Sequence, residues 1–442
     1  MPDWATPMSE PERRPRLEPG EQLEISGGTP LRGRVTVSGS KNAALPQMAA
    51  SLLADGPLRL SNVPGIEDVE TMCRLLGGLG AKVDRSRSEV QIDPRGVNQS
   101  ELDGELGRRM RASLLLLGPL LATVGEAALP LPGGDDIGMR RVEQHLEGLR
   151  AMGAVVVEDE FGIRARVGHL HGAHIQLDLP TVTGTENLMM AAARADGITV
   201  ISNAAREPHV VDLALCLKAM GARVSGAGGD RIVIEGVDRL HPAEHRVRAD
   251  YIEAGTFAMA VAATGGDVLI DQLFCDDLGQ VLHKLRWAGC QVEEGGTWLR
   301  ISRPGELRAV DMTTWPHPGF ATDLQAQYVA LMTQAKGLST VSEALFSNRF
   351  QHVEQLLRLG AEISLQGRSA MIRGGAPLRG AELSISDIRS GAALVIGALC
   401  AGGSSRLTNV HHLDRGYEDL VGKLTGLGAS ITLHPARPPE AG

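Results

Sequence analysis

Apolar and polar residues alternate along the 442-residue chain with a period that switches repeatedly between helix and strand. Stretches such as 67–80 and 212–221 place apolar residues at i, i+3, i+4 and i+7, the spacing of a helix with one buried face. Each stretch ends in one phrase: an apolar residue, Gly, a small residue, any residue and a β-branched residue. Such a glycine is typical of a left-handed helix C-cap, and the β-branched residue predicts a strand directly after it.

This phrase occurs six times at nearly equal intervals. Its glycines are Gly80, Gly153, Gly221, Gly289, Gly360 and Gly428, at spacings of 73, 68, 68, 71 and 68 residues. Earlier in each unit comes a helix of small residues, such as 42–56 or 253–266, followed by a β-rich run. Each unit therefore predicts the order strand–helix–strand–helix–strand–strand. A period of about 70 residues is too long for a solenoid, whose repeats run about 20–50 residues.

Six such units predict an α/β protein of two domains with three units each. Helices rich in Ala, Gly and Met are apolar nearly all round, so we expect them inside, with the sheets outside. We expect residues 41–248 to form the first domain. Residues 249–442 form the second, completed by the strand segment 22–40. The proline-rich stretch 1–21 predicts a disordered arm.

Composition narrows the class of partner. The 13 aromatic residues are too few for a base-stacking surface, and a net charge of −9 argues against a nucleic-acid groove. The longest uncharged apolar run, 112–125, is too short to span a bilayer and contains a proline. Five cysteines without metal or disulfide spacing, and an N-terminal stretch unlike a signal peptide, favour the reducing cytoplasm.

Polar residues at junctions between elements are the candidates for chemistry in the first half. Lys41 and Asn42 stand where a strand ends and an apolar helix begins, a natural site for an oxyanion. Lys41 is one of only 6 lysines beside 38 arginines, although a surface lysine would give the same pattern. Arg111 opens an apolar helix, so it needs an anionic partner, which is either a ligand or an internal carboxylate.

A glycine-rich loop at 132–138 carries two adjacent acids, Asp135 and Asp136, and Arg140 and Arg141 follow it. Adjacent carboxylates raise one another's pKa, which suits a general acid. An ordinary solvated turn would look the same.

The second half supplies an acid and three isolated arginines. Asp323 precedes a buried helix, where it is either a functional group or an acid favoured by the helix dipole. Three guanidiniums beside small residues could converge on phosphate and carboxylate groups: Arg349, Arg389 and Arg415. Ion pairs with the nearby Asp387 and Asp414 are the alternative. The chain contains no phosphate-binding loop, dinucleotide fingerprint or metal-spaced set, so we expect no metal and no cofactor.

Eight motifs occur in the order typical of one family: SGSKNAALP, MRASLLLLGPL, LPGGDDIG, VTGTENLMMAAA, NAAREP, ATDLQAQ, SNRF and LDRGYE. In these the chain resembles the UDP-N-acetylglucosamine 1-carboxyvinyltransferases, the enolpyruvyl transferases of peptidoglycan synthesis, over residues 22–435. The resemblance implies an inside-out α/β barrel whose two domains close over the substrates. It also implies transfer of the enolpyruvyl group of phosphoenolpyruvate to a sugar 3-hydroxyl, with release of phosphate and no cofactor.

The resemblance also implies roles for individual residues. Lys41, Arg140 and Arg415 would hold phosphoenolpyruvate, with Asn42 beside them, and Asp323 would bind and help deprotonate the attacking hydroxyl. Arg349 and Arg389 would neutralise the phosphate and carboxylate or fasten the closed state. The UDP-sugar site would be lined by Arg111, Arg140, Arg141, Val142, Glu143, Gln144, Thr181, Val182 and Leu345.

The chain departs from the family pattern at several positions. Asp135 stands where the family usually has a catalytic Cys, so we expect activity with Asp135 as the acid, and insensitivity to fosfomycin, which alkylates that thiolate. Arg141 and Glu143 replace Pro and Asp near the expected uracil site. Other departures are Leu179, Tyr251 and Ser347. These changes keep two alternatives open: another nucleotide acceptor, and a non-catalytic UDP-sugar-binding regulator.

Overall fold

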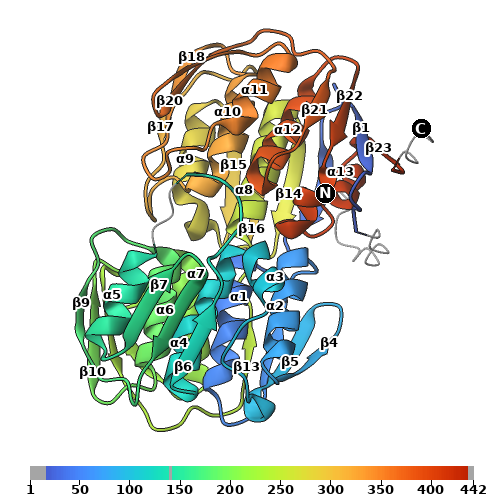
Figure 1. Ribbon diagram of the computed structural model, residues 1–442. Helices are drawn as coiled ribbons and strands as arrows, with labels where there is room; N and C mark the ends of the chain where they lie inside the picture. The colour runs from blue at the N-terminus through green and yellow to red at the C-terminus, as the bar shows by residue number, and fades with distance from the viewer. Residues whose placement is uncertain (1–15, 139–141, 437–442) are drawn as a thin grey trace.

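The computed structural model describes residues 16–138 and 142–436. The chain forms two lobes, the first below the second in Figure 1. Each lobe carries three β-sheets around a bundle of apolar helices. This arrangement confirms the predicted inside-out α/β fold.

The first lobe has a core whose buried residues run from Ala43 to Val247. Its sheets, in order of hydrogen-bonded neighbours, are β13 (Ala243–Arg246), β3 (Leu58–Ser61), β5 (Glu89–Asp93) and β4 (Lys82–Arg85); β6 (Glu126–Leu129), β8 (Gly162–Arg166) and β7 (Val155–Asp159); and β11 (Arg223–Ser225), β12 (Arg231–Glu235), β10 (Ile198–Ser202) and β9 (His174–Gln176). Its helices are α1 (Lys41–Ala50), α2 (Glu67–Gly78), α3 (Gly104–Arg109), α4 (Leu117–Thr123), α5 (Glu143–Ala151), α6 (Val182–Ala192) and α7 (Pro208–Ala219), with short 3₁₀ turns η1 (Ser51–Leu53), η2 (Pro94–Gly96) and η3 (Arg111–Leu116).

The second lobe has its own core, drawn from Leu23 to Val37 and from Tyr251 to Ile431. Its sheets are β21 (Glu382–Ser384), β22 (Ser404–Thr408), β1 (Gln22–Ser26) and β23 (Ser430–His434); β15 (Gln291–Gly295), β16 (Trp298–Ser302), β14 (Asp267–Asp271) and β2 (Arg32–Thr36); and β17 (Met312–Thr313), β18 (Gly337–Ser342), β20 (Ser369–Gly374) and β19 (Glu362–Gln366). Its helices are α8 (Tyr251–Thr264), α9 (Gly279–Trp287), α10 (Gln325–Met332), α11 (Gln351–Arg358), α12 (Ile388–Cys400) and α13 (Leu420–Gly426), with η4 (Cys275–Leu278), η5 (Thr322–Leu324) and η6 (Val410–Arg415).

The chain passes between the lobes twice, and the two passages lie side by side. Ser40 N–H donates to the carbonyl of Arg248 at 2.8 Å, and Asp250 N–H donates to the carbonyl of Ser38 at 2.9 Å. The strand before the first passage, β2, belongs to the second lobe and runs parallel to β14, whereas the strand before the second passage, β13, belongs to the first lobe and runs parallel to β3. The second lobe therefore combines strands from before the first passage with strands from after the second, whereas all strands of the first lobe lie between the two passages.

The six repeated glycines adopt the backbone conformation that the sequence predicts. Their φ angles are +102, +98, +104, +102, +91 and +96°. In the first copy Ala81 N–H donates to the carbonyl of Leu76, and in the third Ala222 N–H donates to that of Leu217. These 6→1 bonds satisfy carbonyls that the helix end leaves free.

The innermost helices are buried on all sides, as their composition predicts. Every residue of α8 from Tyr251 to Ala263 is buried, as is every residue of α12 from Ile388 to Leu399. Small side chains allow such close approach: a Cβ on Gly255 would lie 2.6 Å from Leu324. The outer helix α11, by contrast, buries only His352, Val353 and Leu356.

Two details differ from the repeat predicted from sequence. The second unit has a three-stranded sheet, because its leading strand is reduced to one parallel bridge between Glu101 and Ala128. Residues 16–21, assigned by sequence to a disordered arm, form specific contacts, since Leu17 packs on the second core. No helix in the described ranges is long and apolar enough to cross a membrane.

Candidate active site

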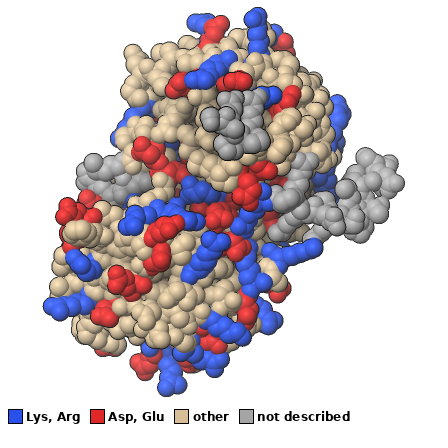
Figure 2. Space-filling view, turned by 45° about the vertical axis from the view of Figure 1, so that its right-hand side comes forward, with Lys and Arg blue, Asp and Glu red and all other residues tan. Residues whose placement is uncertain are grey.

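The glycine-rich loop of the first lobe reaches across to the second lobe. The Asn348 backbone N–H donates to the carbonyl of Ile137 at 3.2 Å, and Gln351 Nε2 donates to the carbonyl of Asp136 at 2.8 Å. Gly138 has φ +97°, and a Cβ there would lie 2.3 Å from Ser347 Oγ. The close approach explains the glycine. Charged side chains of both signs gather along this boundary between the lobes (Figure 2).

Two cations and two carboxylates from four separate elements meet beneath this loop. Arg415 Nη1 of η6 lies 2.6 Å from Asp135 Oδ1, and its Nε lies 3.2 Å from Asp68 Oδ1 of α2. Asp68 also accepts a bond from Lys41 Nζ, at the first turn of α1, at 3.2 Å. Lys41 is therefore not a surface lysine, because its side chain is only 14% exposed.

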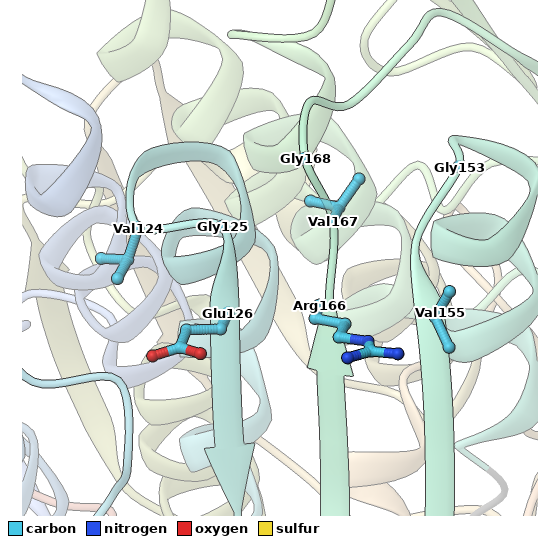
Figure 3. Close-up of a pocket in the computed structure, with 8 residues that line it drawn as sticks. All are labelled: Val124, Gly125, Glu126, Gly153, Val155, Arg166, Val167 and Gly168. Carbon is cyan, nitrogen blue, oxygen red and sulfur yellow. The ribbon is translucent and has the colours of Figure 1, made fainter.

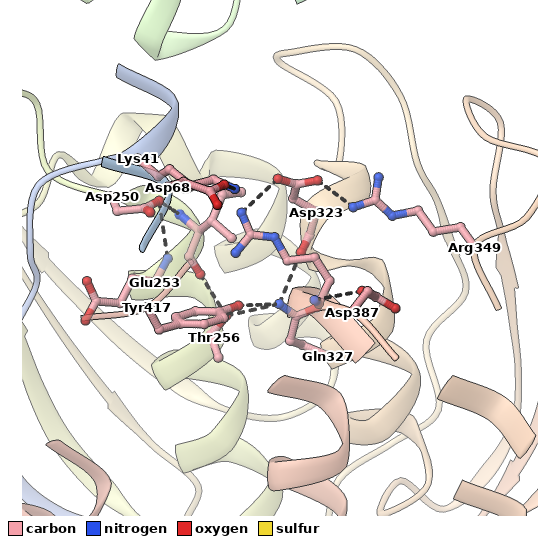
Figure 4. Close-up of polar contacts among 12 residues, drawn as sticks. Lys41, Asp68, Asp250, Glu253, Thr256, Asp323, Gln327, Arg349, Asp387 and Tyr417 are labelled. Carbon is pink, nitrogen blue, oxygen red and sulfur yellow. Dashed lines mark hydrogen bonds and ion pairs between the residues drawn. The ribbon is translucent and has the colours of Figure 1, made fainter. Parts of the chain in front are cut away.

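Asp323 forms a second charged group with two of the predicted arginines (Figure 4). Arg349 Nη2 donates to Asp323 Oδ1 at 2.5 Å, and Arg389 Nη2 donates to Oδ2 at 2.9 Å. The Arg389 guanidinium lies 5.4 Å from the centre of the Tyr417 ring. Gln327 Nε2 donates to the Tyr417 hydroxyl and to the carbonyl of Asp323, each at 3.1 Å.

The alternative ion pairs do not form. Asp387 accepts bonds from the backbone N–H groups of Arg389 and Ser390 at 2.9 and 3.0 Å, which makes it the N-cap of α12. Asp414 accepts a bond from the backbone N–H of Leu17 at 2.6 Å. The guanidiniums of Arg389 and Arg415 are directed instead at the carboxylates described above.

The predicted raised pKa of the loop acid is wrong for the ligand-free protein. Burial alone would raise the pKa of Asp135, but the positive charges of Arg415 and Lys41 outweigh it and lower the pKa. The pKa of Asp323 is likewise lowered, since Arg389 and Arg349 more than offset its burial. Asp135 and Asp323 are therefore ionised at neutral pH as long as no other anion, such as a substrate, binds these cations.

The residues expected around a UDP-sugar lie at the starts of helices in the first lobe. Arg111 begins η3. The burial of His145, together with the positive charge of Arg111, lowers the pKa of His145 to about 3. Glu143, exposed, begins α5, whereas Val142 before it is buried. Gln144 Oε1 accepts bonds from the backbone N–H groups of Asp178 and Leu179 at 2.7 and 3.2 Å, which leaves its amide NH₂ as a donor.

The remaining predicted residues are placed as follows. The Thr181 hydroxyl oxygen caps α6 by accepting the backbone N–H of Gly184 at 3.3 Å, and Val182 is the first residue of that helix. Leu345 is 39% exposed and its N–H donates to Glu343. Asn42 lies partly buried in the first turn of α1. Arg140 and Arg141 lie outside the described residues.

The sequence prediction missed several groups. Asp68 looked like an ordinary acid in the first turn of a helix, yet it links Lys41 to Arg415. Glu186 and Glu207 each have a buried carboxyl oxygen without a partner within the described chain, and burial raises the pKa of both. The His209 ring stacks on the Tyr251 ring with 6.3 Å between their centres. The negative charge of Asp323 acts to raise the pKa of both groups. The stacking on Tyr251 of α8 links this group to the second lobe, and so does the His317 N–H, 3.2 Å from Glu207 Oε1.

A surface depression of about 420 Å³ lies away from these residues, at one end of the β6–β8–β7 sheet (Figure 3). Its walls come from turns around Gly125, Gly153 and Gly168, with Glu126 and Arg166 as its charged groups. No set of three potential metal-ligating side chains occurs in the described ranges. The boundary between the lobes is thus the candidate active site.

Comparison with known proteins agrees with this geometry. Residues 25–424 match the family described as EPSP synthase (3-phosphoshikimate 1-carboxyvinyltransferase). The chain belongs to this enolpyruvyl transferase family. It is 48% identical over 413 residues to the UDP-N-acetylglucosamine 1-carboxyvinyltransferase of Magnetococcus marinus, covering 93% of this chain and 99% of that protein. It is 50% identical over 411 residues to the enzyme of the same name from Sorangium cellulosum, covering 92% and 97%.

Solved structures of enolpyruvyl transferases share the fold. The enolpyruvyl transferase NikO from Streptomyces tendae superposes with a TM-score of 0.86 at 27% identity, covering 95% of this chain and all of that one. EPSP synthase from Acinetobacter baumannii superposes with a TM-score of 0.74 at 18% identity, covering 94% of this chain and all of that one. The latter likeness concerns the fold alone.

Proposed function

We propose that the protein transfers the enolpyruvyl group of phosphoenolpyruvate to the 3-hydroxyl of UDP-N-acetylglucosamine and releases phosphate, the first committed step of peptidoglycan synthesis. The observation that carries the proposal is the 48–50% identity, over more than nine-tenths of the chain, to two enzymes named for this reaction. The likeness to NikO, at 27% identity, is too distant to favour a different nucleotide acceptor.

The charged network supplies what the first, additive step requires. Lys41 and Arg415, with Asn42 and Arg140, bind the anionic groups of phosphoenolpyruvate. The 3-hydroxyl oxygen attacks C2 of phosphoenolpyruvate while Asp135, in its protonated form, gives a proton to the C3 methylene. Asp323 accepts the hydrogen bond of that hydroxyl and takes its proton.

The ligand-free geometry explains how Asp323 becomes a base. Two guanidiniums now hold its pKa far too low for proton transfer. When Arg349 and Arg389 turn to the phosphate and carboxylate of phosphoenolpyruvate, that stabilisation weakens and the pKa of Asp323 rises. In the second step the same cations stabilise the departing phosphate, while Asp135, now a carboxylate, removes a proton from C3 to restore the double bond.

We propose that the UDP-sugar lies along the helix starts of the first lobe. The Gln144 amide, the Thr181 hydroxyl and the N-terminal turn at Val182 offer donors to the nucleotide, with Arg111, Val142 and Glu143 beside them. Arg140, Arg141 and, from the second lobe, Leu345 complete this site. Residues 41–248 and 249–442, the latter with 22–40, act as the two closing domains.

The test is phosphate release from phosphoenolpyruvate with a panel of acceptors: UDP-N-acetylglucosamine, UDP-glucose, UMP and shikimate. We expect turnover with UDP-N-acetylglucosamine and loss of at least about a hundredfold in kcat for Asp135→Ala. Turnover only with another acceptor would establish the alternative substrate. Tight UDP-sugar binding without any turnover would establish a regulator instead of an enzyme.

A further inference from the structure

Residues 16 and 17 lie across the boundary between the lobes. Arg16 Nη1 contacts Glu67 Oε2 at 3.0 Å, and its Nη2 contacts Glu70 Oε1 at 3.3 Å, both on α2 of the first lobe. The next residue, Leu17, donates its backbone N–H to Asp414 Oδ2 at 2.6 Å in η6 of the second lobe. Two consecutive residues therefore bind one lobe each.

These contacts run directly beside the proposed phosphoenolpyruvate site. Glu67 directly precedes Asp68 in the chain, and Asp414 directly precedes Arg415. Asp68 and Arg415 themselves form an ion pair at 3.2 Å. Consecutive Cα atoms are separated by a fixed distance of about 3.8 Å. The backbone of residues 16 and 17 thus joins the groups that contact α2 and η6, and it adds a second connection between these elements beside the Asp68–Arg415 ion pair.

The attachment to the second lobe is the more buried of the two. Leu17 packs against the second core, and burial raises the pKa of Asp414 to about 6, partly offset by the Leu17 N–H and the charge of Arg16. At the other end the Arg16 side chain is 37% exposed, and Glu70 also holds Arg85 at 2.7 Å. The segment is anchored in one lobe and makes an adjustable ion pair with the other.

We propose that residues 16 and 17 form an interdomain clip that positions Arg415 and favours the closed arrangement of the lobes over phosphoenolpyruvate. Arg16, Leu17 and Asp414 act as positioning residues, because they reach the substrate only through Arg415. The inference rests on the proposed function, since Arg415 matters to turnover only if it binds phosphoenolpyruvate.

The first test compares two truncated chains, each with an initiator Met: residues 16–442, which keep the clip, and residues 19–442, which lack it because the Met then stands at position 18. We expect the shorter chain to show a KM for phosphoenolpyruvate about fivefold to tenfold higher, from the loss of two partly exposed ion pairs and one charge-assisted hydrogen bond. We expect kcat and Tm to stay near those of the longer chain. Equal KM values for the two chains would overturn the proposal, as would a parallel loss of kcat and Tm.

The second test changes single residues in the full chain. Arg16→Ala should raise the same KM by about threefold, whereas Arg16→Lys, which retains the charge, should restore most of it. Arg32→Ala removes an exposed arginine of the second lobe and should have no effect. If Arg32→Ala raised the KM for phosphoenolpyruvate as much as Arg16→Ala, the effect would come from net charge in general, and the clip would be refuted.

Amide hydrogen exchange of residues 410–415 tests the clip separately from the proposed transferase function, because the measurement requires no turnover. Residues 19–442 should exchange faster there than residues 16–442 in the absence of substrates. If the full chain releases no phosphate but this difference is present, the proposed function fails and the clip stands. Equal exchange in a chain that is active refutes the clip alone.

Discussion

Asp135→Asn tests whether the loop acid acquires its proton from the binding of substrate. In the ligand-free protein the pKa of Asp135 lies below its ordinary value of 3.8, because Arg415 and Lys41 outweigh the effect of burial. A general acid must carry a proton before it can deliver one. Phosphoenolpyruvate must therefore raise this pKa by several units if Asp135 is the acid, and binding at neutral pH must take up a proton.

The expected size of this change follows from Coulomb's law. A single negative charge about 5 Å from the carboxylate, at an effective dielectric constant of about 20, costs about 3 kcal/mol, which raises the pKa by about 2. Phosphoenolpyruvate brings a phosphate and a carboxylate, nearly three negative charges at neutral pH. Two of them near the Arg415 guanidinium, which lies 2.6 Å from Asp135, oppose the effect of the cations and raise the pKa of Asp135 towards neutral pH.

Calorimetric titration with phosphoenolpyruvate at pH 7, in buffers of different ionisation enthalpy, measures this proton uptake. A UDP-N-acetylglucosamine analogue without the 3-hydroxyl keeps the site closed and prevents turnover. We expect wild-type protein to take up at least about half a proton more than Asp135→Asn, and Asp136→Asn to match wild type. Equal uptake by wild type and Asp135→Asn would refute the reasoning, since any protonation of the substrate itself is common to both.

Three further results are expected. Wild type should resist fosfomycin, whereas Asp135→Cys should be inactivated irreversibly and Asp136→Cys should not, as residual activity after preincubation will report. Asp68→Asn should lower kcat/KM for phosphoenolpyruvate by about tenfold with little change in UDP-sugar affinity, because it orients both Lys41 and Arg415; unchanged kinetics would contradict this role. Gly221→Ala should destabilise by about 1 kcal/mol at φ +104°, and Gly77→Ala, at an open helical position, should not, as denaturant unfolding will measure.

The fold could be predicted because each repeat ends in a local sequence pattern, a helix C-cap glycine followed by a strand. A glycine at a helix C-cap is required by its own backbone angle, so all six remained readable in the sequence. A second repeated signal passed unnoticed. Asn62, Asn203, Gln272 and Asn409 follow the central strands β3, β10, β14 and β22 with φ between +56 and +58°. Asparagine tolerates this conformation well, so an asparagine directly after the β run was a usable marker in three of the six units.

The pairing of charges across the lobes could not be read in the same way. Asp68 and Arg415 are 347 positions apart in the chain, and Asp135 and Arg415 are 280 apart. Each of these residues has an ordinary local explanation: Asp68 is an acid in the first turn of a helix, and Asp135 is a residue of a glycine-rich loop. Only the closure of one lobe on the other brings them together, and no periodicity in the sequence encodes that distance.

The same contacts connect the stability of the closed form to its chemistry. In the absence of substrate, Asp135 pairs with Arg415 and Asp323 pairs with Arg349 and Arg389. In the proposed mechanism these guanidinium groups bind phosphoenolpyruvate. A folded-state pKa below the ordinary value means that these pairs stabilise the fold above about pH 4 and lose that effect as the pH falls through the lowered pKa. Substrate anions must displace both carboxylates to bind, which weakens affinity. The displaced carboxylates are then left near negative charge, where one gains a proton to donate and the other becomes a base. In the proposed mechanism, the competition that weakens substrate binding thus converts two ion pairs into an acid and a base only when phosphoenolpyruvate is present.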